Sequence, residues 1–547
     1  MKNFLILFFA AFVLEISTVA QSYDHLSILP KPTEVKRGVQ DSFFILNRDT
    51  KIINCTEIAD MKYVVNELER IAEDILGKKL KKARVVEREN NIIIRYADNL
   101  GEEGYKLSIA PENIIIQAKS SAGAFYAVQT LKQIIPIQAF ETPIDLKELK
   151  LPITEISDAP HFAYRGFMLD CARHFWEVET VKEILDIMAL HKMNRFHWHL
   201  TEDQGWRIEI KKYPLLTKIG SLREQTTTGH NEGYDGIPYG GFYSQKDIKE
   251  IVKYAQERFI TIIPEIEIPG HSLGALCAYP WLGCRGEEGN YKTWPLWGVS
   301  PQIACAGKES TFKFWEDVLK EVVELFPGEY IHIGGDEAPR DEWKVCPLCQ
   351  KRIKENNLKN EAELQSYVTH RIEEFLAKHN RKLIGWDEIL EGGVSKDATI
   401  MSWRGASGGI NAARKGNYAI MTPNDHCYLD YFQTTDRQDE PDAIGGYVSL
   451  GKTYALNPYN KLTPEQQKYI LGVQGNLWCE YISTPMQLQY MALPRLGAIA
   501  EIGWSNPSAE DKDAKEFIDR AKHLSRYYSV FGWNFAKHFY EGVDIKE

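Results

Sequence analysis

Apolar and polar positions follow two different rhythms along this chain of 547 residues. In the first part, runs such as NIIIRYA and YKLSIAPENIIIQA have the composition of strands separated by turn residues. The stretches MKYVVNELERIAEDIL and GAFYAVQTLKQII have helical spacing instead. A polar, proline-containing stretch, KELKLPITEISDAPHF, then marks a boundary. The pattern predicts a small α+β domain over 22–155.

From about residue 160, short apolar runs alternate with amphipathic helical stretches. Eight of these runs read as strands: GFMLDCA, RFHWHL, ITIIPEIEI, EYIHIGG, KLIGW, ATIMSW, YAIMTPN and YILGVQGNLW. Eight strand-then-helix units predict an α/β fold, a (β/α)8 TIM barrel over 156–505. A doubly wound sheet would need a glycine-rich phosphate-binding turn after an early strand, and the sequence has none. Helical spacing after the barrel predicts an extension over 506–547 that packs on it.

The N-terminus has the three parts of a secretory signal. Lys2 supplies a positive start, 4–14 is apolar, and Thr18-Val19-Ala20 ends in small residues. The apolar run is shorter than the ~20 residues that a membrane span needs. We therefore expect a signal peptide over 1–20, no membrane anchor, and an exported protein that is periplasmic or extracellular.

Charge and cysteine content limit the ligand classes. The formal net charge of −11 argues against nucleic acid, whose phosphates favour Lys and Arg. Nine cysteines are too sparse for a disulfide scaffold. Cys346-Pro-Leu-Cys349 has the spacing of half a zinc site, but no second pair at suitable spacing accompanies it, so a local disulfide or two free thiols is favoured. Cys284 and Cys305 could close the loop between them. The sequence predicts no metal and no cofactor.

Polar and aromatic residues gather where the predicted strands end. Among them are Asp170, Arg173, His174, His197, His199, Glu202, Asp203, Glu265, Glu267, His271, Asp336, Glu337, Trp386, Asp387, Glu388, Trp403, Arg404, Tyr428, Asp430, Trp478 and Glu480. In a barrel of this kind the chemistry lies at the carboxyl ends of the strands. Each residue taken singly has a plainer explanation: Asp336 could cap a helix, His271 could be a core histidine, and each Trp could fill the barrel.

Taken as a set, these residues favour a sugar ligand. Aromatic faces stack on the apolar face of a pyranose ring, and carboxylates accept hydrogen bonds from its hydroxyls. An oxocarbenium-like transition state also needs a carboxylic acid of raised pKa for the leaving oxygen and negative charge near the ring.

The motifs LDCARHFW, HWHLTEDQGWRIEI, EIPGHS, HIGGDEAP and NLWCEYI occur in this order. Together they resemble family 20 glycoside hydrolases, the β-N-acetylhexosaminidases, over nearly the whole mature chain. The resemblance implies an exo-acting, retaining enzyme that removes terminal non-reducing β-linked GlcNAc or GalNAc from glycans. It further implies substrate-assisted catalysis, in which the 2-acetamido oxygen attacks the anomeric carbon and forms an oxazolinium ion.

The resemblance also assigns the adjacent acids. Glu337 is the general acid for the glycosidic oxygen and then the base for water, while Asp336 holds and polarises the acetamido N–H. Neighbouring residues of an extended strand point to opposite sides, so the two acids can reach different parts of a substrate. An ionised Asp336 is expected to raise the pKa of Glu337. Gly334 and Gly335 leave room for substrate and permit unusual backbone angles.

The remaining implied residues bind substrate. They are Arg173 for the ring hydroxyls at O3 and O4; Trp386, Trp403 and Trp478 for the walls of the acetamido pocket; Tyr428 for the acetamido oxygen; Asp430 and Glu480 for the O4 and O6 hydroxyls; and His271 with Glu202 for a polar network behind the acid. Family members commonly carry Asp where this chain has Glu202, which keeps the charge and lengthens the reach.

Two other functions are compatible with parts of the pattern. A metal-dependent amidohydrolase is one, because His197 and His199 alternate along a strand and can both face the barrel mouth. A catalytically silent glycan-binding protein is the other, although the presence of both Asp336 and Glu337 speaks against it.

Overall fold

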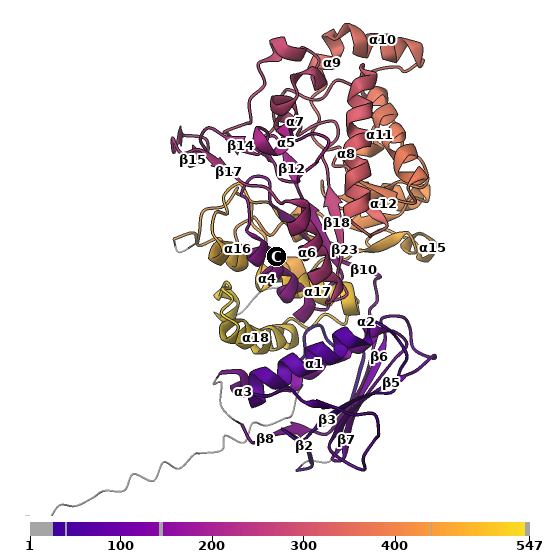
Figure 1. The fold of residues 1–547 in the computed structure, drawn as a ribbon, viewed down its shortest axis with the longest axis vertical. Coiled ribbons are helices and arrows are strands. Elements are labelled where there is room, and N and C mark those ends of the chain that lie inside the picture. Colours follow the sequence, from indigo (N-terminus) through magenta and orange to yellow (C-terminus); the bar gives the residue numbers. More distant parts are fainter. Residues whose placement is uncertain (1–25, 39–40, 142–145, 439, 542–547) are drawn as a thin grey trace, which may run out of the picture.

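The chain folds into two bodies stacked end to end (Figure 1). The computed structural model describes residues 26–38, 41–141, 146–438 and 440–541, so the predicted signal peptide lies outside the described residues. The indigo N-terminal domain lies beneath a larger barrel domain in Figure 1. Among the described residues, none of the helices has the length and apolar composition needed to cross a bilayer.

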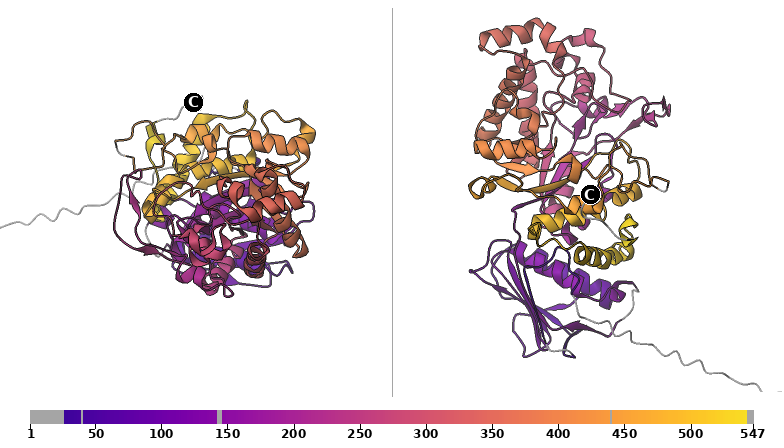
Figure 2. Two further views of the ribbon diagram at one scale, coloured as in Figure 1. Left: turned by 90° about the horizontal axis from the view of Figure 1, so that it is seen from above. Right: turned by 180° about the vertical axis from the view of Figure 1, so that it is seen from behind.

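The N-terminal domain is a mixed seven-stranded sheet covered by two helices. Its strand order is β1 (Glu34–Arg37), β9 (Thr154–Asp158), β6 (Tyr105–Ile109), β7 (Asn113–Ala118), β5 (Asn91–Tyr96), β3 (Lys51–Asn54) and β4 (Lys81–Lys82). Helices α1 (Met61–Leu76) and α2 (Ser121–Ile134) lie on the sheet face that is turned toward the barrel (Figures 1 and 2). Because α2 lies between the sheet and the barrel, it is buried on nearly all sides. The predicted α+β domain is confirmed.

The second body is the predicted barrel. Eight strands close in chain order, each parallel to its neighbours: β10 (Tyr164–Asp170), β11 (Arg195–His199), β18 (Thr261–Glu265), β19 (Tyr330–His332), β20 (Lys382–Trp386), β21 (Thr399–Ser402), β22 (Ala419–Met421) and β23 (Ile470–Leu477). The outer helices include α4 (Val178–Leu190), α6 (Gln245–Gln256), α8 (Glu309–Leu325), α11 (Glu361–Lys378), α12 (Ser407–Lys415) and α17 (Arg495–Ser505). This arrangement confirms the (β/α)8 fold and brings all eight strand ends to one mouth.

A buried ion pair joins the two bodies. Lys192 Nζ lies 3.1 Å from Asp158 Oδ2, and neither side chain is exposed. The hydroxyl of Tyr105 and the indole N–H of Trp504 also donate to Asp158, at 2.7 and 2.9 Å. Because these partners satisfy the buried carboxylate, the contact fixes the orientation of the N-terminal domain on the barrel instead of leaving a charge unpaired.

The C-terminal helix α18 (Ala514–Val530) contacts both bodies. Arg520 on this helix forms hydrogen bonds of 2.9 and 2.7 Å to the carboxylate of Glu501 in α17. The hydroxyl of Tyr527 donates to the backbone oxygen of Ile135, at 2.6 Å, just beyond the end of α2. The helix therefore braces the N-terminal domain against the barrel on the side away from the mouth (Figure 1).

Candidate active site

The adjacent acids lie in a sharply bent segment that follows β19. Gly334, Gly335 and Glu337 all have positive φ, at 64°, 91° and 43°. The bend separates the two carboxyl side chains: Asp336 is 10% exposed, whereas Glu337 is 42% exposed. No helix begins at Asp336, since α9 (Asp341–Val345) starts only later. The helix-cap explanation for Asp336 is therefore wrong.

Residue 334 must be glycine in this bend, because a side chain at this position would collide with a buried acid. A Cβ built at Gly334 would lie 1.8 Å from Oε2 of Glu267, and its φ is already in the left-handed region. We expect Gly334→Ala to lower the free energy of unfolding by about 2–4 kcal/mol, from backbone strain and overpacking together. Urea denaturation measures this loss.

Gly393 supplies a matched control for that variant. Its φ is 103°, yet a Cβ there would have no atom within 4 Å. Gly393→Ala should therefore show the backbone cost alone, about 1–2 kcal/mol. If the two variants lose the same stability, the contact with Glu267 is not what requires glycine at 334.

His271 connects both acids to a deeper carboxylate. Its Nε2 lies 3.6 Å from Asp336 Oδ2 and 3.7 Å from Glu337 Oε2, and its Nδ1 lies 2.6 Å from Glu202 Oε1. Burial is the largest single effect and opposes the charged ring, but the charges of Glu202 and Asp336 and the hydrogen bonds to Asp203 and Glu202 together outweigh it and hold the pKa of His271 well above its usual value. The side chain is thus an imidazolium that faces the acid pair, with carboxylates and not backbone groups as its partners.

The pKa of Asp336 is raised to about 7. Burial is the main cause, and the charges of Glu265, Glu337 and Glu202 add to it while His271 opposes them. Asp336 therefore takes up or releases a proton near neutral pH. Holding an ionised carboxylate at this buried position lowers the free energy of unfolding.

Arg173 anchors the other side of Glu202. Its guanidinium lies 3.0 Å from Glu202 Oε2 and 3.2 Å from Asp170 Oδ2, and its Nε donates to Gln204 at 3.1 Å. Although burial opposes ionisation of Glu202, Arg173 and His271 hold the pKa of this carboxyl well below its usual value. Arg173 also lies 3.9 Å from Glu480, a residue from a different strand end.

Glu265, one of the strand-end residues for which no role followed from the sequence, lies buried at the centre of the next layer. Its carboxylate oxygens lie 2.8, 2.6 and 2.9 Å from ring nitrogens of His197, His199 and His332 and accept a hydrogen bond of 2.8 Å from the indole N–H of Trp386. The alternation of the two histidines along β11 does place both inside the barrel. Each histidine has a ring nitrogen within hydrogen-bond distance of Glu265. This layer therefore holds His199 and Trp386 in place beneath Asp336 and Glu337.

Aromatic rings from four strand ends form one wall of the mouth. Trp403 stacks on Tyr428 with centroids 6.0 Å apart and planes 22° apart. The ring centroid of Trp478 lies 5.7 Å from that of Trp386 and 6.5 Å from that of Tyr428. The guanidinium carbon of Arg173 lies 5.0 Å from the ring centroid of Trp478. The four aromatic residues predicted from the sequence are thus brought together.

Glu388, for which no role follows from the sequence, holds one residue of this wall in place. The indole N–H of Trp403 donates to Glu388 at 2.9 Å. Burial, with a contribution from Asp336, raises the pKa of Glu388 to about 8. Its only sequence signal was its place in the strand-end segment Trp386-Asp387-Glu388.

Asp430 is a buried acceptor without a partner. Neither of its carboxylate oxygens accepts a hydrogen bond from another side chain in the described part of the chain. Burial and the nearby charge of Glu480 raise its pKa well above the usual value. Because an unpaired buried carboxylate costs free energy, the pair formed by Asp430 and Glu480 is suited to accept hydrogen bonds from ligand hydroxyls.

Two family models match the chain. The model of glycosyl hydrolase family 20, catalytic domain, matches residues 162–507, and that of glycosyl hydrolase family 20, domain 2, matches residues 25–159. The chain belongs to glycosyl hydrolase family 20. This membership agrees with the resemblance of the motifs and does not favour the amidohydrolase alternative.

Relatives within family 20 agree over most of the chain. A β-hexosaminidase of Porphyromonas gingivalis is 46% identical over 93% of this chain, which spans 64% of that relative's length, less than two thirds. A solved exo-β-N-acetylglucosaminidase of Vibrio harveyi in complex with N-acetylglucosamine superposes with a TM-score of 0.82 at 32% identity, covering 94% of this chain and 79% of that one. The N-acetyl-β-hexosaminidase of Streptomyces plicatus gives 0.81 at 30%, with 93% and 96% covered.

Proposed function

We propose that this family 20 enzyme is an exo-acting, retaining β-N-acetylhexosaminidase. It removes terminal non-reducing β-linked GlcNAc or GalNAc from glycans by substrate-assisted catalysis. The observation that carries the proposal is the division between the adjacent acids: Asp336 is buried and close enough to Tyr428 of the aromatic wall to affect its ionisation, and Glu337 is exposed. One acid can thus serve the acetamido group while the other reaches the leaving group.

In the first step the acetamido oxygen attacks the anomeric carbon as the glycosidic bond breaks. Glu337 gives its proton to the departing oxygen, so that the aglycone leaves as a neutral alcohol. Asp336 accepts a hydrogen bond from the acetamido N–H and offsets the positive charge of the oxazolinium ion. In the second step water attacks the anomeric carbon and gives a proton to the Glu337 carboxylate. The bond between the anomeric carbon and the acetamido oxygen breaks, which opens the oxazolinium ring, restores the acetamide and returns the anomeric carbon to the β-configuration.

His271 supports both acids without contacting the reacting bond. Its imidazolium faces Asp336 and Glu337 at 3.6 and 3.7 Å and is held by Glu202. A positive charge at this position favours the ionised form of Asp336, which the mechanism needs, against the burial that disfavours it. Glu202 thereby acts through His271 and Arg173.

The remaining groups suit a terminal sugar. Arg173, Asp430 and Glu480 come from strand ends that meet beside Trp478. In this position they can bind the O3, O4 and O6 hydroxyls of a sugar ring stacked on the indole of Trp478. A further sugar attached at O4 would disrupt these hydrogen bonds. A terminal HexNAc residue of a glycan is therefore the proposed substrate, and the sequence of residues 1–20 supports export as its route to such glycans.

A panel of aryl β-glycosides with one common aglycone tests this function. We expect hydrolysis of the GlcNAc and GalNAc glycosides with a β-configured first product by NMR. The glucoside lacks the internal nucleophile, so its kcat/KM should be lower by about 10³-fold or more. Comparable cleavage of the glucoside, or an α-configured first product, would refute the proposal.

A further inference from the structure

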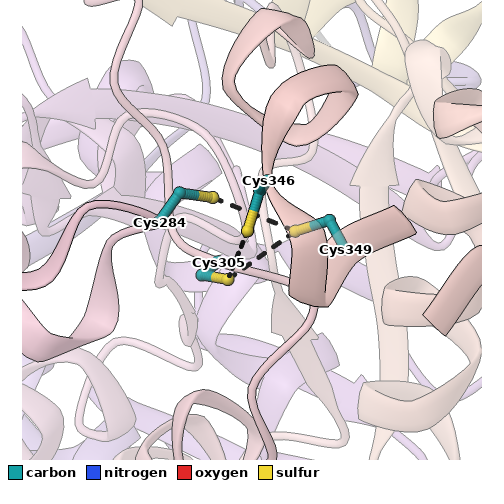
Figure 3. Close-up of side chains that lie close together, drawn as sticks. All are labelled: Cys284, Cys305, Cys346 and Cys349. Atoms are coloured by element: carbon teal, nitrogen blue, oxygen red, sulfur yellow. Dashed lines mark hydrogen bonds between the residues drawn. The ribbon is translucent and has the colours of Figure 1, made fainter. Parts of the chain in front are cut away.

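Four cysteines from distant parts of the chain converge outside the active site (Figure 3). Cys284 and Cys305 lie at the neck of the loop between β18 and α8, and Cys346 and Cys349 lie at the start of α10 (Pro347–Glu355). All four sulfur atoms lie within 4.8 Å of one another. The sequence alone had favoured a local disulfide or free thiols for the pair at 346 and 349.

The spacing of the sulfurs matches a metal tetrahedron. The Sγ–Sγ distances are 3.6 Å for Cys305–Cys349, 3.8 Å for Cys305–Cys346 and 3.9 Å for Cys284–Cys349. Zinc bound to four thiolates at about 2.3 Å from each places the sulfurs about 3.8 Å apart. A disulfide would instead bring one pair to about 2.05 Å.

The surrounding backbone is built to bring the two pairs together. Gly283 and Ala304 form an antiparallel bridge. Cys284 directly follows Gly283 and Cys305 directly follows Ala304, so the bridge holds the two cysteines close together at the narrow base of the loop that they enclose. A Cβ at Gly307 would lie 2.3 Å from the backbone carbon of Leu348 and 2.4 Å from the nitrogen of Cys349. Only glycine at 307 therefore allows the neck to approach the first turn of α10 this closely.

The environment also favours thiolates. Cys346 is the N-cap of α10 and Cys349 lies in its first turn, where the helix dipole favours negative charge. Two cations border the cluster: Lys308 Nζ donates to the backbone oxygen of Gly283 at 2.6 Å, and Arg352 donates to that of Gly307 at 3.1 Å. Three of the four cysteines are buried and the fourth is half-buried, as in a closed structural site.

We propose that Cys284, Cys305, Cys346 and Cys349 bind one structural Zn²⁺ ion. The four thiols give up their protons to solvent on binding, and no residue is oxidised. The ion joins the loop after β18 to the segment after β19, which carries Asp336 and Glu337.

Trp343 makes the same connection, because its indole N–H donates to the backbone oxygen of Ala304 at 3.0 Å. The same loop reaches the site itself, since the N–H of Ser300 donates to Asp203 at 3.1 Å. The ion is thus proposed to stabilise the loops that frame the acids.

Metal analysis of the purified full chain tests this proposal directly. We expect about one zinc per chain, and replacement by Co²⁺ should give the visible absorption of tetrahedral cobalt thiolate. Cys305→Ser and Gly307→Ala should lower the zinc content and the Tm. Cys55→Ser, which changes an exposed cysteine outside the cluster, should keep both.

The wild-type measurement decides the matter even if a cysteine variant does not fold. Alkylation followed by mass spectrometry, with and without reductant, reports the state of the sulfurs. Metal-free protein with two disulfides, metal-free protein with four reactive thiols, or iron in place of zinc would each overturn the assignment. Zinc retained at wild-type level by folded Cys305→Ser would place the ion elsewhere and have the same consequence.

Discussion

Glu337→Gln is expected to lose about 10²- to 10⁴-fold in kcat/KM on a substrate whose leaving group is a sugar alcohol. An alkoxide cannot depart without a proton, and glutamine cannot supply one. An aryl glycoside with an acidic phenol needs little protonation, so its kcat/KM should fall by less than about tenfold. Its kcat should still fall, because hydration of the oxazolinium ion needs the base. Steady-state kinetics on the two substrates measures this contrast.

Asp341 provides a matched control for the general acid. It is an exposed carboxylate on the same segment, paired with Lys344 at 2.8 Å. Asp341→Asn should leave the kinetics of both substrates unchanged. An equal loss on both substrates in Glu337→Gln would show that Glu337 does not act as the acid.

Asp336→Asn is expected to lose about 10²- to 10³-fold in kcat/KM on both substrates alike. The acetamido group must be oriented and its developing charge offset whatever the leaving group is. Asparagine keeps the shape of the side chain but removes the negative charge. The two acids therefore give different kinetic patterns, one dependent on the leaving group and the other not.

A stability measurement distinguishes this loss from misfolding. The pKa of Asp336 is raised to about 7 in the folded protein, above its unfolded value, so the cost of ionising it grows as the pH rises from about 4 and is complete above about 7. At pH 8 the neutral asparagine should therefore keep or raise the Tm, and this advantage should shrink toward pH 4. A variant that loses activity together with Tm at pH 8 would point to a structural role, and a variant with near wild-type kcat/KM would contradict the mechanism.

Local pattern predicted most of the fold. The run KLIGW coincides with β20, and MKYVVNELERIAEDIL coincides with α1. The run ITIIPEIEI extends past the end of β18 at Glu265, although Ile266 still donates a backbone hydrogen bond to His332 of β19 and Ile268 donates one to Ile333 just after it. Alternation and helical spacing are local properties, which explains why they sufficed for elements and their order.

The same local patterns pointed to the residues at the mouth and to His271 with Glu202, but not to the roles of the acids that support them. Strand ends and motifs pointed to Asp336, Glu337 and the aromatic wall. The role of Glu265 depends on partners from three other strands, and that of Glu388 on the indole of Trp403, so neither followed from spacing. The four-cysteine cluster was missed for the same reason, since the fold alone brings Cys284 and Cys305 to the pair at 346 and 349.

The central claim is that the substrate's own acetamido oxygen is the nucleophile. The most direct test is kcat/KM of the wild-type enzyme on aryl glycosides whose 2-acetamido methyl group carries zero, one, two or three fluorine atoms. Fluorine withdraws electrons from the carbonyl oxygen while barely changing its size. Internal attack predicts that kcat/KM falls with every added fluorine. A rate that is independent of fluorination would contradict the account.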